Sequence, residues 1–270
     1  MKSTARFIGL AVLSMVLSAV AHAETTNCTP ITGAWYTIGA PGIYCLNSSI
    51  SSQIQVNADG VVIDLNGHAL EGLGTGTGIY AVDRKNLTVR NGTIRGFHTG
   101  IRVDGKASHG HLFEQLRVSD NGNAGISVHG DGSVVRDNLF LNNCGVAGAG
   151  AKWAIFVAGT GVHVHDNEVV ETGVGVTPNE VVGIRIGGAG VVVERNVVSN
   201  AIVGSTGSRG IAVLASGKNT VVGNRIVNMK IGILNAIDFG GTTLFLDNTV
   251  GGTITPFAGG TMAGSTNYSF

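Results

Sequence analysis

Charged residues are scarce in this 270-residue sequence, at 13% of the total, and neither sign is in excess, with 17 basic and 17 acidic residues. A coiled coil needs far more charge, and a disordered chain needs a lower apolar content than the 43% found here. No run of like charges interrupts the sequence. Attraction to nucleic acids or to anionic lipid surfaces depends on clusters of basic residues. We therefore expect that the protein binds neither nucleic acid nor an anionic membrane surface.

Long apolar runs are absent after residue 23. Before it, Lys2 and Arg6 precede an apolar run over residues 7–20, and the small residues of Ala21-His22-Ala23 fit a cleavage site. We therefore interpret residues 1–23 as a signal peptide. A membrane-spanning helix requires roughly 18 uninterrupted apolar residues, so the mature protein is predicted to be secreted or periplasmic and not membrane-spanning.

Cysteine is rare, with three residues in the chain. Cys28 and Cys45 flank the segment that begins the mature protein, and an exported protein meets conditions that permit disulfides. This predicts a bridge between them that staples an N-terminal cap, with Cys144 left as a buried thiol. The alternative is that all three cysteines are unpaired.

Segments with the pattern of a helix, which needs roughly 10 to 12 residues, are also absent. The sequence instead contains an internal repeat. Aligning the chain on one polar position gives units spaced by 23 to 29 residues, marked by Asn66, Asn91, Gln115, Asn138, Asn167, Asn196, Asn224 and Asn248. In the later units, one apolar residue stands three positions before the polar residue and another stands two positions after it. A repeat of this period indicates a solenoid.

A second element, Gly-Ile or Ala-Ile, follows the polar position in most units. Apolar residues then alternate with others, as in Ile101/Val103, Ile126/Val128 and Ile184/Ile186, which predicts a strand with one face in the core. Val and Ile dominate where a leucine-rich repeat would have Leu, and helical repeats are excluded by the short segments. Each unit is therefore predicted to form one coil of short strands, paired in parallel with the next coil.

The polar residues would form one column in such a stack, and two roles for that column are open. In the first, each side-chain amide donates to the next and the column is a continuous ladder. In the second, each Asn supports a left-handed turn within its own coil.

Three segments carry a family resemblance: VVIDLNGH at 61–68, LTVRNGTIRGF at 87–97 and the pair Gly100-Ile101. They resemble the right-handed parallel β-helix proteins of pectate-lyase-like architecture, and PGIYCL at 41–46 is similar to the lead-in strand of that group. The resemblance covers roughly residues 36–250 and implies an all-β fold, a single-stranded right-handed parallel β-helix of about eight coils. The predicted organisation is a signal peptide (1–23), an N-terminal cap with a lead-in strand (24–58), the β-helix (59–250) and a C-terminal cap or tail (251–270).

The resemblance implies a polysaccharide groove on the outward face of one sheet. Beside the Gly-Ile strands the outward column reads Tyr80, Arg102, Ser127, Phe156 and Arg185, with Trp153 next to it. Guanidinium groups bind carboxylates and aromatic rings stack on sugars, so Tyr80, Arg102, Phe156, Arg185 and Trp153 are predicted to bind substrate. Long connections at 142–153, 171–183 and 200–210 are expected to form one wall of the groove. The alternative is a solvated strand surface.

The catalytic signatures that pectin hydrolases and alginate epimerases of this group carry are missing. A lyase would need a base beside positive charge that neutralises the uronate. Lys152, at a loop end beside the groove, is one candidate for catalysis. His129 with Asp104 or Asp131, at the groove edge, is another, although one His near one Asp is a weak pattern.

One position before the polar column stand Glu114, Asp137, Asp166 and Arg195. Stacked about 5 Å apart, the three carboxylates could hold Ca²⁺, which resembles how related lyases assemble a metal site. The alternative is that the turn itself requires a left-handed residue, since Gly223 follows in the next unit.

Two histidine pairs, His109-x-His111 and His163-x-His165, place two imidazoles on one strand face and suit a transition metal. His111 and His163 stand at the same position of the repeat, two coils apart. A metal ion shared between them would need a ligand from the intervening coil, where Val134 stands, and this weakens a joint site. Exposed or coil-capping histidines are the alternative.

These patterns predict an exported β-helix protein that binds an acidic polysaccharide, and cleaves or epimerises it, on the outer face of one sheet. The alternative function is a non-catalytic protein that binds a metal ion or a protein partner.

Overall fold

The computed structural model describes residues 24–145, 151–173, 180–201, 207–215, 217–236, 242–262 and 266–270. The signal peptide predicted at 1–23 lies outside these residues. The described part of the chain is all-β, with two parallel sheets and no α-helix. It accordingly contains no helix with the length and hydropathy of a membrane span.

The smaller sheet, sheet B, holds the Gly-Ile strands in the order in which they occur in the chain. Its ten described strands are β2 (Trp35–Ile38), β5 (Gln53–Val56), β8 (Thr77–Val82), β10 (Thr99–Asp104), β12 (Ala124–His129), β15 (Ala151–Ala158), β18 (Glu180–Ile186), β21 (Ser208–Val213), β24 (Ile231–Asn235) and β27 (Thr255–Ala258). Ile101 pairs with Ile79 on one side and with Ile126 on the other, and the same register continues through Ile155 and Ile184. The predicted in-register stacking of the Gly-Ile strands is confirmed.

The larger sheet, sheet A, holds the strands before and after the polar position of each unit. Its described strands are β1 (Thr29–Pro30), β3 (Gly42–Cys45), β4 (Ile50–Ser51), β6 (Val61–Asp64), β7 (Ala69–Glu71), β9 (Thr88–Arg95), β11 (Leu112–Ser119), β13 (Val134–Arg136), β14 (Leu139–Leu141), β16 (His163–His165), β17 (Glu168–Val170), β19 (Val192–Glu194), β20 (Val197–Ser199), β22 (Lys218–Val222), β23 (Arg225–Val227), β25 (Thr242–Leu246), β26 (Thr249–Gly251), β28 (Thr261–Met262) and β29 (Tyr268–Ser269). Most coils supply two short strands separated by a bend, and β9 and β11 run through that bend. Both terminal segments, 24–58 and 251–270, add strands to the same sheets.

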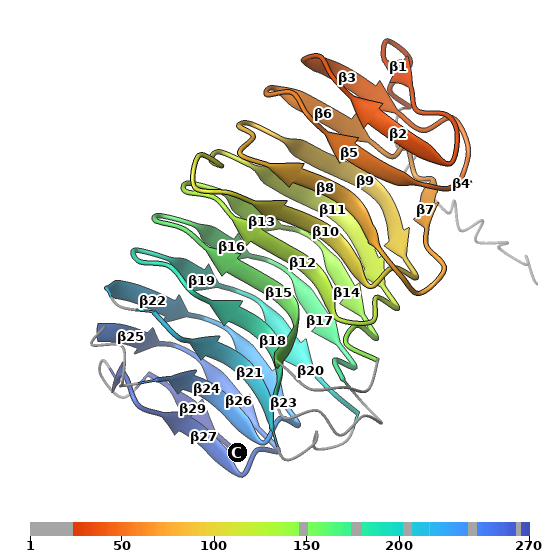
Figure 1. The fold of residues 1–270 in the computed structure, drawn as a ribbon. Coiled ribbons are helices and arrows are strands. Elements are labelled where there is room, and N and C mark those ends of the chain that lie inside the picture. The colour runs from red at the N-terminus through yellow and green to blue at the C-terminus, as the bar shows by residue number, and fades with distance from the viewer. Residues whose placement is uncertain are drawn as a thin grey trace, which may run out of the picture.

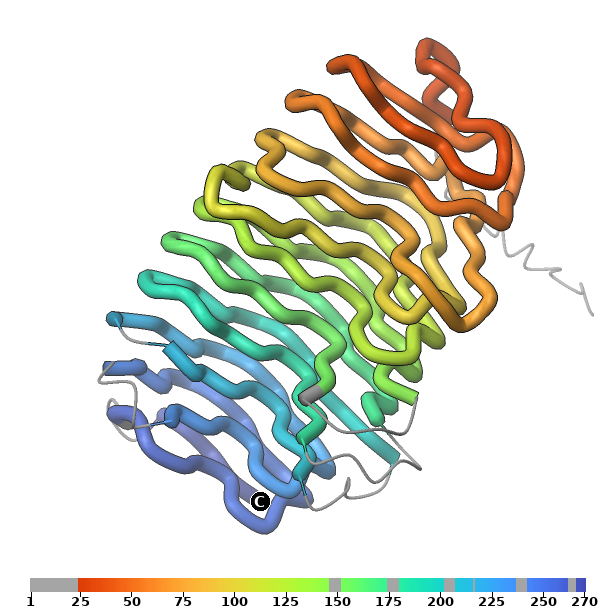
Figure 2. Tube along the Cα trace, viewed as in Figure 1, coloured from red at the N-terminus to blue at the C-terminus, as the bar shows by residue number. Residues whose placement is uncertain are grey.

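The coils stack into a rod with the two ends of the described chain at opposite ends (Figures 1 and 2). Its interior is filled by columns of Ile and Val from both sheets together with a few phenylalanines. Ile101, Ile126 and Ile184 are fully buried and point into this common interior, as do Phe113 and Phe140. Burial of such side chains contributes about 1.5–3 kcal/mol each, so the rod is held together by a continuous apolar core.

The bend in sheet A requires the left-handed conformation in eight successive coils. The residues with positive φ there are Asn66, Asn91, Gln115, Asp137, Asp166, Arg195, Gly223 and Asp247. Gln115 lies at the offset of Asp137 because Glu114 pairs with Arg136. The single polar column read from the sequence was therefore wrong by one residue from Asn138 onward. The predicted column combines two structural positions that both favour Asn.

The asparagines from Asn138 onward form the predicted ladder one residue after the bend. Each Nδ2 donates to Oδ1 of the next, at 2.9 Å from Asn138 to Asn167 and 3.0 Å from Asn167 to Asn196, and the ladder continues through Asn224 and Asn248 to Asn267. Backbone amides of the bend also donate to these oxygens, as at Asn167 N. Both roles considered for the column are thus found, the left-handed turn in the early coils and the ladder in the later ones.

The cysteine prediction is confirmed in the described structure. Cys28 and Cys45 form a disulfide across 17 residues, and Cys144 is a free, buried thiol. Burial raises the pKa of the Cys144 thiol, which leaves it in its unreactive protonated form.

Candidate functional site

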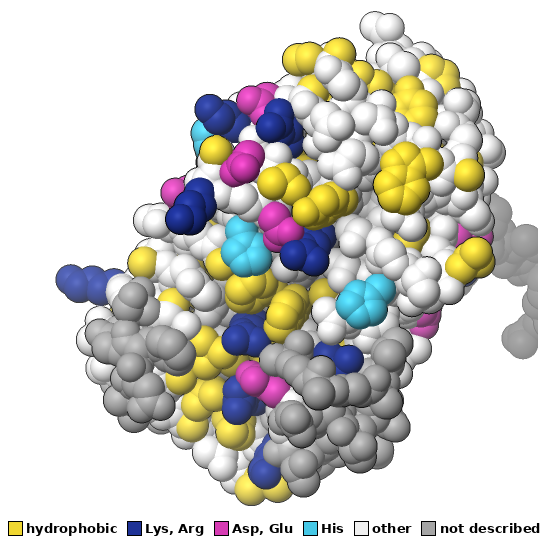
Figure 3. All heavy atoms as spheres, in the orientation of Figure 1, with side chains coloured by type: hydrophobic (Ala, Val, Ile, Leu, Met, Phe, Trp, Pro, Cys, Tyr) yellow, Lys and Arg dark blue, Asp and Glu magenta, His cyan; other side chains and the backbone are white. Residues whose placement is uncertain are grey.

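The outward side of sheet B carries the column of side chains that the sequence predicted. Tyr80 pairs with Arg102, Arg102 with Ser127, Ser127 with Phe156 and Phe156 with Arg185. Hydrophobic, basic, acidic and histidine side chains gather in a band over β10, β12, β15 and β18 (Figure 3). The rigid sheet therefore presents two guanidinium groups and several rings on one surface.

Arg185 lies against two aromatic rings at one end of this band. Its guanidinium carbon is 5.1 Å from the ring centroid of Trp153 and 5.7 Å from that of Phe156. The two rings are themselves 5.0 Å apart. This packing restricts the rotamers of all three side chains, so that the arginine and the rings are positioned before a ligand arrives.

Asp104 lies on β10, at the other end of the band, and contacts two basic side chains. Its Oδ2 accepts a hydrogen bond of 2.7 Å from Nε of Arg102, and its Oδ1 lies 3.3 Å from Nδ1 of His129. The His129 ring meets the edge of Phe156 at 5.2 Å. Asp104 can therefore hold the His129 ring with Nδ1 toward the carboxylate and Nε2 away from it. Two of the three residues predicted for catalysis are thus in contact.

Two surface hollows meet at Asp104 and His129. The first, of about 360 Å³, is lined by Arg102, Ser127, Trp153 and Phe156 among others. The second, of about 330 Å³, lies at the other end of the same strands beside Lys106, Ser108 and Asp131. Since both hollows include Asp104 and His129, this pair stands between them.

Lys152, the third residue predicted for catalysis, does not reach the open face. Its side chain is only 5% exposed, and its charge acts on the buried thiol of Cys144. The neighbouring Trp153 points to the face instead. The loop wall predicted from 142–153, 171–183 and 200–210 lies partly outside the described residues.

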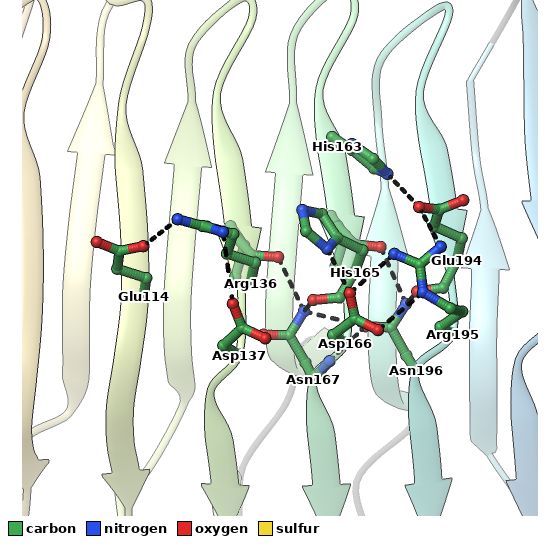
Figure 4. Close-up of polar contacts among 12 residues, drawn as sticks. Glu114, Arg136, Asp137, His163, His165, Asp166, Asn167, Glu194, Arg195 and Asn196 are labelled. Atoms are coloured by element: carbon green, nitrogen blue, oxygen red, sulfur yellow. Dashed lines mark hydrogen bonds and ion pairs between the residues drawn. The ribbon is translucent and has the colours of Figure 1, made fainter.

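The structure does not bring the three carboxylates of the predicted calcium site together. Glu114 pairs with Arg136 rather than with Asp137, and its carboxylate lies 2.5 Å from the Arg136 guanidinium (Figure 4). Asp137 also contacts Arg136, at 3.7 Å. Asp166 instead accepts hydrogen bonds from Arg195. Within the described ranges no group of three or more metal-binding side chains is present.

Asp137 and Asp166 stand at the bend because it requires positive φ, at 56° and 54°. This is the alternative considered for that position, and Asp tolerates the conformation because its short side chain bonds locally. Hydrogen bonds from Arg195 and His165 lower the pKa of Asp166 to about 2. The carboxylate is therefore charged and already paired.

The two histidine pairs differ in environment. His111 is 1% exposed, its Nδ1 accepts a hydrogen bond from Leu87 N, and burial lowers its pKa to about 4. His163 aligns with Val134 and therefore with Leu112, so the offset predicted for His111 and His163 was wrong by one residue. His163 contacts Glu194 at 3.2 Å on the surface of sheet A (Figure 4).

The first coils extend this face beyond the residues that were predicted from the sequence. Trp35 pairs with Gln53, and Gln55 pairs with Tyr80, which places these side chains along the outward side of β2, β5 and β8. They line a hollow of about 230 Å³ together with Thr77. The alternation in Trp35-x-Thr37 and Gln53-x-Gln55 is the signal that could have revealed it.

Comparison with known proteins places this geometry among parallel β-helix structures. An alginate lyase from Paenibacillus sp. strain FPU-7 superposes with a TM-score of 0.60 at 16% identity, covering 84% of this chain and 87% of that one. A GH87 α-1,3-glucanase from Streptomyces thermodiastaticus has a TM-score of 0.34 at 13% identity, covering 93% of this chain and 72% of that one. The likeness to the alginate lyase is one of fold, and no curated protein matches the sequence. The model of the right-handed β-helix region matches residues 22–250, and the chain therefore belongs to the right-handed β-helix family.

Proposed function

We propose that the outward face of sheet B binds an acidic polysaccharide and that His129, held by Asp104, takes a proton from it in its cleavage. The observation that carries the proposal is the continuous contact of Arg102, Asp104 and His129 with the aromatic cluster of Phe156 and Trp153 in one hollow. Catalytic groups, positive charge and ring surfaces meet there on a rigid sheet.

The two arginines provide the affinity for acidic sugars. Arg102 is exposed and Arg185 half-buried, and each guanidinium can donate two hydrogen bonds to one carboxylate. Trp153 and Phe156 offer flat apolar surfaces to the C–H faces of a sugar ring. The similar structure from Paenibacillus is an alginate lyase. Alginate is a polymer of uronates and is therefore the first ligand to test.

The cleavage step proposed is a β-elimination. Nε2 of His129 takes the proton on the carbon next to the uronate carboxylate, the freed electron pair forms a carbon–carbon double bond, and the glycosidic C–O bond breaks. The leaving oxygen takes up a proton from water, and the protonated His129 later returns its proton to the solvent. Arg102 neutralises the carboxylate while the charge develops. Asp104 stabilises the protonated imidazole. Lys152 has no part in this step because its side chain is buried.

The test combines binding with product absorbance. Alginate and pectate oligomers are titrated by calorimetry with and without Ca²⁺, and cleavage is followed by the ultraviolet absorbance of the unsaturated uronate. The variant Arg102→Ala/Arg185→Ala should bind at least about 100-fold more weakly, since two charged hydrogen-bond donors are lost. His129→Ala should bind the oligomers but produce no absorbance change.

Arg117 and Arg225 are exposed arginines on β11 and β23 of sheet A and provide the matched control. Removing both changes the net charge equally and should leave binding unchanged. If the sheet B variant binds as tightly as the control, the polysaccharide proposal fails. If binding persists in the wild type and no absorbance appears with any oligomer, the face binds without cleaving.

We also propose that the protein is exported, which the N-terminal apolar segment and the disulfide support. Expression with and without residues 1–23, followed by fractionation, should place the longer chain outside the cytoplasm and the shorter chain inside it. Retention of both forms in the cytoplasm would contradict export.

A further inference from the structure

The first coils of sheet B present an outward surface with a chemistry unlike that of the central band. Its described side chains on β2, β5 and the start of β8 are Trp35, Thr37, Gln53, Gln55, Thr77 and Tyr80, and none of them carries a charge. Hydrophobic atoms lie among uncharged polar ones over β2 and β5 (Figure 3). Whatever binds here meets rings and amides and no fixed charge.

Trp35 is the ring that stands out on this surface. It is 66% exposed at the start of β2, the first strand of sheet B. Because the ring lies at the edge of a hollow among polar side chains, its flat face is available to stack on a ligand.

The two glutamines beside it are held in place by their neighbours. A side chain at Gly76 would come within 2.5 Å of Nε2 of Gln53, so this glycine lets the carboxamide lie against the backbone. Gly76 also has φ of +68°, which favours glycine. Gln55 donates a hydrogen bond of 3.1 Å to Asn57. Both amides thus lie at the hollow, Gln53 next to Gly76 and Gln55 next to Asn57.

We propose that this hollow is a subsite for an uncharged sugar unit, with Trp35 as the stacking platform and Gln53 and Gln55 as hydroxyl partners. A carboxamide both donates and accepts hydrogen bonds, which matches a sugar hydroxyl. A uronate carboxylate would find no cation among the described lining residues to offset the loss of its hydration. The subsite therefore selects neutral units.

The subsite continues into the central band through one shared residue. Tyr80 lines the hollow, and the guanidinium of Arg102 lies 5.9 Å from its ring centroid. In the part of the inference that rests on the proposed function, the ligand is a polysaccharide in which neutral units stand next to uronate units. Its chain would pass from Trp35 over Tyr80 to Arg102.

Tryptophan fluorescence tests the subsite directly, because the chain has two tryptophans and the Trp153→Phe variant keeps only Trp35. This variant is titrated with neutral tetrasaccharides of β-1,4-glucan, β-1,4-mannan and α-1,3-glucan. At least one should change the emission in a saturable way. By calorimetry, Trp35→Ala should weaken the same ligand at least about 10-fold, as loss of a stacking ring does. Gln53→Ala/Gln55→Ala should also weaken it.

Leu73→Ala is the matched control, since Leu73 is 91% exposed and is not among the residues that line this hollow. It should bind neutral ligands as the wild type does. Arg102→Ala/Arg185→Ala should also retain them, so that failure of uronate binding and failure of the neutral subsite are separate results. No emission change with any neutral oligomer, or equal affinity for Trp35→Ala and Leu73→Ala, would overturn the proposal. So would a dimer of the full chain that dissociates on Trp35→Ala, because a second copy would then occupy the surface.

Discussion

The guanidinium of Arg195 donates hydrogen bonds of 2.9 Å to both carboxylate oxygens of Asp166, the residue at the same bend one coil earlier (Figure 4). Asp166, which the sequence assigned to a calcium site, thus forms an ion pair with the arginine at the same position in the next coil. The pair links neighbouring coils at the bend where the backbone is left-handed. The carboxylate of Asp166 is therefore used in an ion pair between coils.

Asp166→Asn should lower the free energy of unfolding by about 1 kcal/mol or less at neutral pH, since the pair is largely exposed. Asn tolerates the left-handed bend, so the change isolates the charge. The pKa of Asp166 is lowered from 3.8 to about 2, so its contribution is complete above pH 3.8 and is lost as the pH falls through 2. Urea unfolding of both proteins across this range is the measurement. A difference that stays constant down to pH 2 would contradict the ion pair.

Asn196→Ala should destabilise the protein by about 3 kcal/mol, because it removes a fully buried link of the ladder. The side chain of Asn196 accepts from Asn167 and donates to Asn224, so its loss leaves buried polar groups unpaired on both sides. Denaturant unfolding followed by circular dichroism gives the value. The exposed Asn57→Ala should change it little, and equal effects of the two variants would deny the ladder a structural role.

His111 should make the protein lose stability as the pH falls from 6.5 toward 4. The buried imidazole stays neutral in the folded protein until about pH 4, whereas the unfolded chain takes up the proton near 6.5. At about 1.4 kcal/mol per pH unit the loss reaches about 3 kcal/mol. Asn keeps an acceptor for Leu87 N, so His111→Asn should have a flatter stability profile over this range. Parallel profiles for both proteins would show that His111 does not titrate as its burial requires.

Thiol labelling should give a different count in each of three states. The native protein should label no cysteine, because Cys144 is buried and protonated and the other two are bridged. Unfolding without reductant should expose one thiol, and unfolding with reductant should expose three. Mass spectrometry reads the number of adducts. A label on the native protein would mean that the coil around Cys144 opens.

Sheet B was predictable from the sequence because each of its strands carries two independent sequence signals. The Gly-Ile pair marks where the strand begins, and strict alternation then fixes which residues face outward. Arg102 and Arg185 were therefore assigned to the correct column. His129 was placed at its edge with Asp104 or Asp131, and the sequence did not decide between the two. A local pattern of period two was sufficient for these positions.

Sheet A was harder because its bend has two adjacent positions that both favour Asn. Asn91 occupies the left-handed position, whereas Asn138 accepts backbone hydrogen bonds one residue later. Repeat spacing alone cannot separate these roles when loop lengths also vary. The same one-residue error misplaced Glu114 and His111. Burial of Lys152 and the exposed ring of Trp35 depend on packing between coils, which the sequence pattern does not report.

The stack of coils has a consequence for how such a protein changes over generations. Since each turn of chain rests only on the turn before it and the turn after it, a whole turn can be duplicated or deleted while the contacts inside every other turn stay as they were. Gene duplication can thus lengthen the working surface in fixed increments. A longer descendant would engage more units of its ligand without inventing a new architecture.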